Sequence, residues 1–519
     1  MITRRAVLAT AAAVPALAAF TPVNDADAKF YALLDTLKDE PADAAAARAR
    51  QTADLLKLRT IDRAALSYEA QIDFDSILEG LGLEAILRSR FPFGTTGQTI
   101  SPYAVTHRWG THLSLADVLK SPPPETVAAA LDSETARTTA DAARSVILPT
   151  VIAGRLRAKL GSLRATANEP VARALDRQIA ALNALPGTGI GAWRLPDGDA
   201  YYAQALKIGT SLNSDPALLH QQALMVIDAL NTHADAEFRG IGMTTGTIAE
   251  RFTALINRGT GRYDDSAAGR AQAVADMTAT LARARAAIAP HFDELPKGAI
   301  AIALAPPGRI GYRTAPSYDG RTPGAYYVDL ADPVQGIRYR PAWALPTVVH
   351  HETLPGHLLQ LPLQEKAAPH PVRLRYTPNA FFEAWAIYGE ELAAEIGLVD
   401  HPLPRLGMLQ SLLVRAARLL VDTGIHFRRW SRGEALAKFR ETCVFALNPI
   451  EDEVDRIIVE PGATAGPMAG YLLLLDLRAR IRARTTHGDK DFHTTVLKRG
   501  ALRLTRLDWI VHQELSLPP

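Results

Sequence analysis

Cysteine is almost absent from the sequence, and its scarcity limits the chemistry that the protein can use. Cys443 is the only cysteine in 519 residues. A single thiol excludes an intrachain disulfide, a redox pair and a cysteine-based zinc site. In the segment RETCVFAL we expect it to be a small buried apolar residue. Any metal site must therefore use histidine and carboxylate ligands.

The chain also lacks an excess of charge of either sign. Its 57 lysines and arginines balance 55 aspartates and glutamates, and no long block of one sign occurs. This composition gives no indication of binding to nucleic acid or to an acidic membrane surface. With 48% hydrophobic and 22% charged residues, it is typical of a globular protein with a large core.

The N-terminal apolar run is too short to span a bilayer. It covers the 14 residues Ala6–Ala19, whereas a spanning helix needs about 20. The run follows Arg4-Arg5 and contains a small-x-small cleavage motif at Ala16–Ala18, and a second such motif follows at Ala26–Ala28. This pattern is typical of an export signal that is removed from the mature chain. We therefore expect residues 1–28 to be a signal, and the mature protein, with no membrane span, to be periplasmic or secreted.

The type of export signal is suggested by its first residues. Paired arginines after Thr3 favour twin-arginine export, although Val7 stands where a phenylalanine is usual. A plain secretory signal is the alternative. No cysteine follows the apolar run, which excludes a lipobox.

The remaining chain is predicted to be mainly helical. Residues 29–290 consist of Ala-, Leu- and Arg-rich segments with helical periodicity, such as the one that begins at Pro216. Near residue 300, AIAIALAPP and GAYYVDL read as two strands, and helical patterns return at 346–365, 381–396, 409–430 and near the C-terminus. We predict a single mainly α domain over 29–519, in which 29–290 and 291–519 could form two lobes. The metal site would lie in the second lobe, with a small β-sheet beside the cleft.

The segment VVHHETLPGHLLQ, residues 348–360, resembles the zinc-binding motif H-E-x-x-H but has a longer spacing. On an unbroken helix, His351 and His357 would point about 120° apart and lie about 9 Å apart along the axis. Pro355 breaks the helix, because it lacks an N–H and its ring clashes with the carbonyl of His351. Gly356 supplies the backbone freedom to resume the helix. Two residues looped out in this way would let both imidazoles reach one ion.

Carboxylates near this motif are candidates for the remaining roles. Glu352 takes the position of the general base of the ordinary motif. Glu383 is the candidate third ligand, because an unpaired carboxylate in the apolar segment FFEAWAIYGEEL would be costly. We expect Glu390 and Glu391, at the polar end of that segment, to face solvent. Two alternatives remain open: His350 could replace His351, or the segment could be a capped turn without an ion.

A second group of polar residues lies in RLLVDTGIHFRRW. Arg418, Asp422 and His426 are spaced by four and four, so they share one face of a helix. The apolar residues between them suggest that this helix belongs to the core. The stripe therefore predicts a group that supports the site, with Asp422 orienting His426. A surface ladder of salt bridges is an equally good interpretation of the spacing.

Four segments in order resemble the bacterial domain-of-unknown-function 885 family. They are HHETLPGHLLQ, FFEAWAIYGEEL, RAARLLVDTGIHFRRWSRGEAL and DFHTTVLKRGALRL. The upstream segments SPYAVTHRWGTH, YYAQALKIGTSL and APSYDGRTPGAYYVDL fit too, so the resemblance covers roughly residues 70 to 510. The family is similar to gluzincin metallopeptidases. The resemblance thus implies a helical fold with one Zn²⁺ held by His351, His357 and Glu383, and Glu352 as the base.

The chain also departs from the family pattern at several positions. Some changes fall inside the segments that carry the predicted metal ligands, and others fall around the segment PGATAGPMAG, residues 461–470. The residues that replace the usual ones are Leu358 for histidine, Ala384 for glycine, Ile457 for tyrosine, Ala463 for glutamine, and Pro467 and Met468 for a tyrosine-lysine pair. The metal centre looks intact, whereas part of the substrate-binding and oxyanion apparatus is replaced. Losing one oxyanion donor typically costs about 100- to 1000-fold in turnover, so we expect either His426 or Tyr388 to substitute, or the substrate to differ.

Together these observations predict an exported zinc-dependent hydrolase of peptide or other amide bonds. In GAYYVDL, Tyr326 and Tyr327 would line the cleft, and the strand would align an extended substrate by strand addition. One alternative is a metal-binding pseudoenzyme or binding module of the cell envelope. Another is an enzyme retooled for an unusual amide or a cyclisation in a biosynthetic pathway.

Overall fold

The computed structural model describes most of the chain after its N-terminal segment. The described residues are 23–37, 44–94, 100–113, 115, 123–259, 261–331, 336–337, 340–443 and 450–517. The predicted export signal lies almost wholly outside them. Its second cleavage motif, Ala26–Ala28, falls in the first helical turn, where Asp27 is buried and accepts a hydrogen bond from Ser67 N (2.9 Å). Cleavage there would remove a packed contact.

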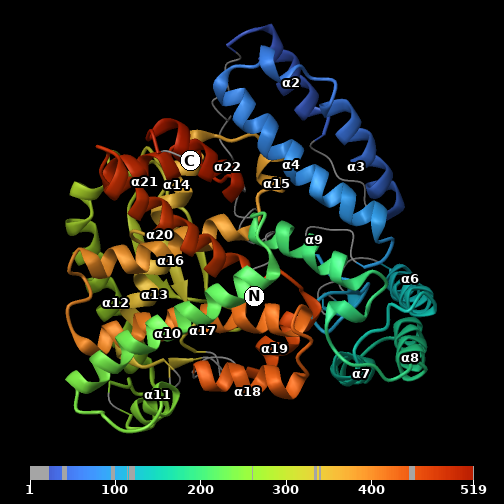
Figure 1. Cartoon of the computed structure of the whole chain (residues 1–519). Coiled ribbons are helices and arrows are strands. Elements are labelled where there is room, and N and C mark those ends of the chain that lie inside the picture. The colour runs from blue at the N-terminus through green and yellow to red at the C-terminus, as the bar shows by residue number, and fades with distance from the viewer. Residues whose placement is uncertain are drawn as a thin grey trace.

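Helices dominate the architecture, as the sequence predicts (Figure 1). Before the sheet lie α2 (Asp25–Asp35), α3 (Ala44–Leu58), α4 (Tyr68–Arg90), α6 (Pro124–Ala143), α7 (Thr150–Arg164), α8 (Glu169–Asn183), α9 (Gly198–Thr210), α10 (Pro216–Gly240), α11 (Ile248–Asn257) and α12 (Ala267–Ala287). After it lie α13 (Leu345–Glu352), α14 (His357–Ala367), α15 (Pro371–Arg375), α16 (Asn379–Glu395), α17 (Pro402–His426), α18 (Arg432–Thr442), α19 (Ile450–Val459), α20 (Gly466–Arg484), α21 (Asp489–Leu497) and α22 (Leu504–Glu514).

Local sequence signals explain where the long helices begin. α10 starts at Pro216, as predicted, because Asp215 caps it by accepting hydrogen bonds from Ala217 N and Leu218 N. At α18, Ser431 and Glu434 form a reciprocal capping box. α17 begins at Pro402, earlier than the predicted residue 409, because His401 caps it.

The small sheet has three strands. β1 (Ile300–Leu304) and β3 (Gly324–Val328) are the two predicted strands, and β2 (Tyr312–Thr314) lies between them in sequence. The spatial order is β1-β3-β2, with β1 parallel and β2 antiparallel to β3. Both edges of β3 are therefore already paired. The prediction that GAYYVDL aligns a substrate by strand addition is wrong, because only β1 and β2 present an outer edge.

Most buried apolar side chains belong to one continuous core. It contains residues from before and after position 290, such as Phe238, Phe252, Trp385 and Ile457. The two predicted lobes therefore share a core. A second, smaller cluster joins α2, α3 and α4 to α15 through Val372 and Tyr376. Figure 1 shows α2–α4 lying together along one side of the molecule.

The segment 348–360, which carries the two predicted histidine ligands, spans the end of α13 and the start of α14. α13 packs against α12, α16 and α17, and α16 packs in turn against α20. In the part of the chain that the structure describes, no helix is both long and apolar enough to cross a membrane.

Candidate metal centre

The helix carrying the histidines is interrupted between them, as the sequence predicts. α13 ends at Glu352 and α14 begins at His357. The turn is closed by Gly356 N, which donates to His350 O (3.0 Å), and by Leu358 N, which donates to Thr353 O (3.0 Å). These bonds span six and five residues instead of the four of an α-helix. The extra residues of the motif are thus accommodated in the turn.

Gly356 is required in this turn because the backbone passes close to itself. A Cβ atom there would lie 2.0 Å from His351 O and 2.5 Å from His350 O. α16 holds the turn from outside, where Trp385 Nε1 donates to Pro355 O (2.9 Å). Gly389 lets α16 approach, since a Cβ there would lie 3.2 Å from Gly356 N. The turn is therefore held firmly against α16, the helix that carries Glu383.

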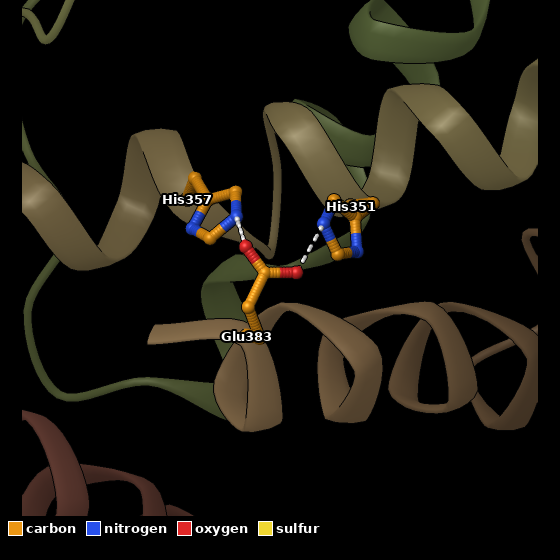
Figure 2. Close-up of side chains that lie close together, drawn as sticks. All are labelled: His351, His357 and Glu383. Carbon is orange, nitrogen blue, oxygen red and sulfur yellow. Dashed lines mark ion pairs between the residues drawn. The ribbon is translucent and has the colours of Figure 1, made fainter. Parts of the chain in front are cut away.

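The three predicted ligands meet at one point. His351, His357 and Glu383 each offer a ligand atom, and these atoms all lie within 4.8 Å of one another. Figure 2 shows the Glu383 carboxylate between the two rings: Oε2 lies 3.6 Å from His351 Nε2, and Oε1 lies 3.7 Å from His357 Nε2. These distances are too long for hydrogen bonds. Two imidazoles and one carboxylate are a ligand set of catalytic zinc sites.

His351 is oriented by residues behind it. Its Nδ1 donates to Glu390 Oε1 (2.7 Å), and Arg415 Nη2 donates to the same oxygen (3.0 Å). This bond directs Nε2 towards Glu383. Burial lowers the pKa of His351, but the carboxylates of Glu383 and Glu390 outweigh it and raise the pKa to about 9. The same carboxylates would stabilise a metal cation on Nε2 in place of the proton.

The prediction that Glu390 faces solvent is wrong. Its side chain is only 1% exposed, because it lies under His351 and is neutralised by Arg415. A sequence signal for this existed. Glu390 follows Glu383 by seven residues, which is two helical turns, so both lie on one helix face. Arg415 had no such signal, because it comes from α17.

His357 is buried and unsatisfied. The residue is 1% exposed, and neither ring nitrogen has a hydrogen-bond partner among the described residues. Burial and the nearby Arg313 lower its pKa. A neutral, buried imidazole with an unpaired nitrogen facing a carboxylate fits a metal ligand, because an ion would satisfy the polar atom that is otherwise costly to bury.

The alternative ligand, His350, does not join this group. Its Nδ1 lies 3.1 Å from Leu354 O, within the turn. The residue is fully buried, and burial lowers its pKa to about 4. The geometry therefore selects His351 of the two adjacent histidines.

Glu352, the predicted base, is paired with an arginine that the sequence analysis did not identify. Arg313 Nε of β2 donates to Glu352 Oε2 (2.8 Å). Burial raises the pKa of Glu352, but Arg313 and then the two ligand histidines outweigh it, so the pKa is lowered. Glu352 is therefore ionised and next to the ligand group, as a base must be.

The two predicted substrate-binding tyrosines of β3 lie on opposite faces of the sheet. Tyr326 is the cross-strand partner of Arg313 and shares its face, towards Glu352. Burial and the charge of Glu352 raise its pKa. Tyr327 instead stacks on Tyr312, with ring centroids 4.5 Å apart. Only Tyr326 is thus placed on the side of the candidate site.

Asp422 and His426 are both fully buried but do not form the predicted pair. Asp422 accepts hydrogen bonds from Tyr202 Oη (2.8 Å), Gly462 N (3.1 Å) and Thr464 Oγ1 (2.9 Å). It therefore holds the turn of the altered segment 461–470. Burial raises its pKa to about 7.

His426 uses both ring nitrogens in backbone contacts. Nδ1 accepts from Ala192 N (2.9 Å), and Nε2 donates to Ile457 O (2.9 Å). Arg418, the third residue of the stripe, donates through Nε to Glu453 Oε2 (2.7 Å). Each member of the stripe thus has partners of its own, because the helix face is covered by α19 and the turn after it.

Tyr388 also points away from the ligand group. It follows Glu383 by five residues, which turns its side chain about 140° around α16. Its hydroxyl donates to His493 Nε2 (2.6 Å), and His493 Nδ1 donates to His291 O (2.9 Å). The hydroxyl is thus engaged in a buried network on the other side of the helix. In the altered segment, Met468 is fully buried and Pro467 partly exposed.

Comparison with known proteins places the chain in a family. The model described as "Bacterial protein of unknown function (DUF885)" matches residues 125–511. The chain therefore belongs to this family. The comparison with curated proteins gave no match.

Two solved structures share the fold. One, described as a "putative lipoprotein" from Colwellia psychrerythraea, aligns with a TM-score of 0.72 at 25% identity, over 90% of this chain and 91% of that one. The other, described as a "putative lipoprotein of unknown function" from Shewanella oneidensis, has a TM-score of 0.69 at 16% identity, over 93% and 99% of the two chains.

Proposed function

We propose that the protein is an exported zinc-dependent hydrolase of peptide or other amide bonds. One observation carries the proposal: two histidines and a glutamate from three helices converge within 4.8 Å, with an ionised glutamate directly after the first histidine. The buried and unpaired ring of His357 supports a metal as the missing partner. Lone surface clusters of acidic residues have no such features.

Each residue of the centre has a role in this proposal. His351, His357 and Glu383 would hold the ion, and a zinc ion in such a set supplies a Lewis acid that lowers the pKa of bound water towards about 7. Glu352 would accept a proton from the attacking water and return it to the leaving amine. Glu390 and Arg415 would keep His351 in the correct orientation.

A donor for the substrate carbonyl is also needed. His426 and Tyr388 are engaged in buried bonds elsewhere. Tyr326 is a better candidate, because its hydroxyl has no hydrogen-bond partner among the described side chains and it lies on the Glu352 side of β3. We assign it the substrate-binding role, and Tyr327 none.

Metal content and turnover of matched variants test the proposal. His351→Gln, His357→Gln and Glu383→Gln should each lose zinc from protein purified without added ions, while His233→Gln, an exposed histidine of α10, should retain it. Glu352→Gln should keep zinc and lose turnover on a mixed panel of peptides and amides. Full turnover by Glu352→Gln, or equal zinc content in all variants, would refute the mechanism.

A metal-binding protein without hydrolytic activity is the second candidate. The Arg313–Glu352 ion pair favours it, because the arginine covers one oxygen of the proposed base. The replacement of a tyrosine-lysine pair by Pro467 and Met468 favours it as well. It predicts stoichiometric zinc with no chelator-sensitive turnover on any substrate of the panel, whereas a hydrolase, including one retooled for an unusual amide, predicts some.

A further inference from the structure

Arg313 occupies the carboxylate that the proposed reaction needs. It reaches Glu352 from β2 through a single hydrogen bond, Nε to Oε2. Within the described residues its guanidinium makes no other hydrogen bond, so its two terminal nitrogens, Nη1 and Nη2, have no partner in that part of the chain. The side chain is 11% exposed, and β2 is an edge strand. The free end of the fork is therefore open to a ligand that approaches along this edge.

The charges around the ligand group favour an anionic ligand. Arg313, Arg415 and Arg456 all act electrostatically on the ligand residues, and each is paired with a glutamate. Within these three pairs the charges cancel, and Glu460 also accepts a hydrogen bond from Arg108 Nε (2.7 Å). Glu383 carries one negative charge and a divalent cation would add two positive ones, so the loaded site would carry a net charge of about +1. A substrate with a negative charge would neutralise it.

Arg313 differs from the other two arginines in what its partner does. Arg415 is held by Glu390, whose task is to orient His351, and it also contacts Ser411 O. Arg456 pairs with Glu460, outside the ligand group. Only the partner of Arg313 is a residue that must itself change its hydrogen bonds during the proposed reaction. An exchange of partners at Arg313 would therefore alter catalysis directly.

We propose that Arg313 binds a carboxylate group of the substrate, and that Glu352 holds the guanidinium until that carboxylate arrives. The inference rests on the proposed function and names its substrate class: peptides or amides with a carboxylate close to the scissile bond. The two oxygens of the substrate carboxylate accept hydrogen bonds from two nitrogens of the guanidinium, a bidentate geometry that suits arginine. Glu352 Oε2 is then released to accept a hydrogen bond from water. Only ion-pair partners change in this step.

Two sources could supply the carboxylate, the C-terminus of a peptide or an acidic side chain. Three N-acetylated tetrapeptides distinguish them: tetra-alanine with a free C-terminus, the same peptide as its C-terminal amide, and an amide carrying glutamate at the third position. Binding is measured by calorimetry to zinc-loaded Glu352→Gln, which the proposed mechanism leaves inactive. We expect at least one carboxylate peptide to bind about tenfold or more tightly than the neutral amide.

Substitutions at Arg313 decide whether this preference belongs to it. In the Glu352→Gln background, Arg313→Met should remove the preference, and Arg313→Lys should keep part of it, because it retains the charge without the fork. The matched control is Arg309→Met, which removes an exposed charge from the segment before β2, where Arg309 lies over the Tyr312 ring on the other face. It should leave the preference unchanged. A preference that survives Arg313→Met, or no preference for either carboxylate peptide, overturns the proposal.

Metal-free protein separates this inference from the zinc proposal. After chelation, Glu352→Gln should still bind the carboxylate peptide about tenfold more tightly than the wild-type protein does, because the competing carboxylate is gone. Arg313→Met should abolish this gain. Equal binding by metal-free Glu352→Gln and the metal-free wild-type protein overturns the proposed exchange of partners at Arg313. Absence of zinc from the purified wild-type protein would instead refute the proposed function, while the metal-free measurement still decides the role of Arg313.

Discussion

In the proposed metal site, Glu390 would act on the ion through His351. It is almost fully buried, and its Oε1 receives both the His351 Nδ1–H and an N–H of Arg415. A carboxylate in this position fixes the ring orientation and makes the free nitrogen a better ligand. The candidate site thus consists of five residues. Three of them would touch the ion, and Glu390 and Arg415 would support His351 from behind.

We predict that Glu390→Gln weakens zinc binding about 10- to 100-fold. The amide accepts the His351 proton less strongly and leaves the Arg415 charge unpaired. Competition against a chromophoric chelator measures the affinity. The control is Glu391→Gln at the next position, where the side chain accepts a hydrogen bond from Tyr471 instead. Equal affinities for the two variants would contradict the role of Glu390.

The residues that sequence reasoning found and missed differ in how they are connected. His351, His357 and Glu352 lie within one short segment, and Glu383 stands out as a carboxylate among aromatic residues, so pattern and cost of burial identify them. Arg313 and Arg415 reach the same place from other elements, 39 and 25 residues from Glu352 and Glu390. No helical or strand period links such positions, and arginines are common on surfaces. Only the packing of β2 and α17 reveals them.

At the scale of elements, the turn between α13 and α14 determines whether the two histidines meet. Gly356 has no room for a side chain, since two carbonyl oxygens lie where its Cβ would be. Pro355 and Gly356 predicted a break in the helix, and the structure confirms this break. The predicted reason for the glycine was backbone freedom, whereas the structure shows close approach at a φ of −79°.

We predict that Gly356→Ala destabilises the protein by about 1–3 kcal/mol, because the turn must open to accept the methyl group. Zinc affinity should fall with it, since His357 begins the helix that would be displaced. Thermal unfolding and chelator competition provide the two readouts. Gly161→Ala in α7, where nothing lies within 4 Å of the new Cβ, should instead be neutral or stabilise by about 0.5–1 kcal/mol. Equal changes in stability and zinc affinity for Gly356→Ala and Gly161→Ala would contradict the close packing at Gly356.

Asp422 connects α17 to the turn before α20 and should make stability depend on pH. Its pKa is about 7 in the folded protein, raised by burial, and about 3.9 in an unfolded chain. The unfolded chain therefore releases this proton first, and the free energy of unfolding falls as pH rises from about 4 to about 7. Asp422→Asn removes this titration. Relative to wild type, the variant should become progressively more stable between pH 5 and pH 8.

Melting temperatures at a series of pH values measure this difference, with the exposed Asp400→Asn as control. The stability difference between Asp422→Asn and wild type should change across the series, whereas that for Asp400→Asn should stay constant. A constant difference for Asp422→Asn would show that the carboxyl does not titrate in this range.

The sheet shows where prediction of elements stops. β1 and β3 were recognisable as five-residue apolar strands bounded by proline and glycine. β2 has only three residues, which is too short for any periodicity, so its existence could not be predicted. Because β2 was not predicted, the central position of β3 could not be predicted either. The wrong prediction of strand addition follows from this.

At the scale of the whole molecule, the candidate centre joins helices that lie far apart in sequence. α13, α14 and α16 supply the ligands, and α17 and β2 support them. The continuous core that surrounds them comes from both halves of the chain. The mainly helical class was predictable from periodicity, but the sharing of one core by both halves was not, because composition does not report contacts between distant segments.

We predict that zinc stabilises the whole chain, because an ion held by these ligands binds only the folded state. Free zinc at 100 times its dissociation constant should raise the free energy of unfolding by about 2.7 kcal/mol. Differential scanning calorimetry with and without zinc measures the effect, and a chelator should reverse it. The double variant His351→Gln/His357→Gln should show no response. A similar rise in that variant would place the stabilising zinc elsewhere.

The most direct test of the metal centre is anomalous X-ray scattering at the zinc absorption edge, from crystals of protein purified without added metal. We predict one strong peak between His351 Nε2, His357 Nε2 and the Glu383 carboxylate. A zinc peak at another position, or no peak there after zinc is supplied, would contradict the proposed site.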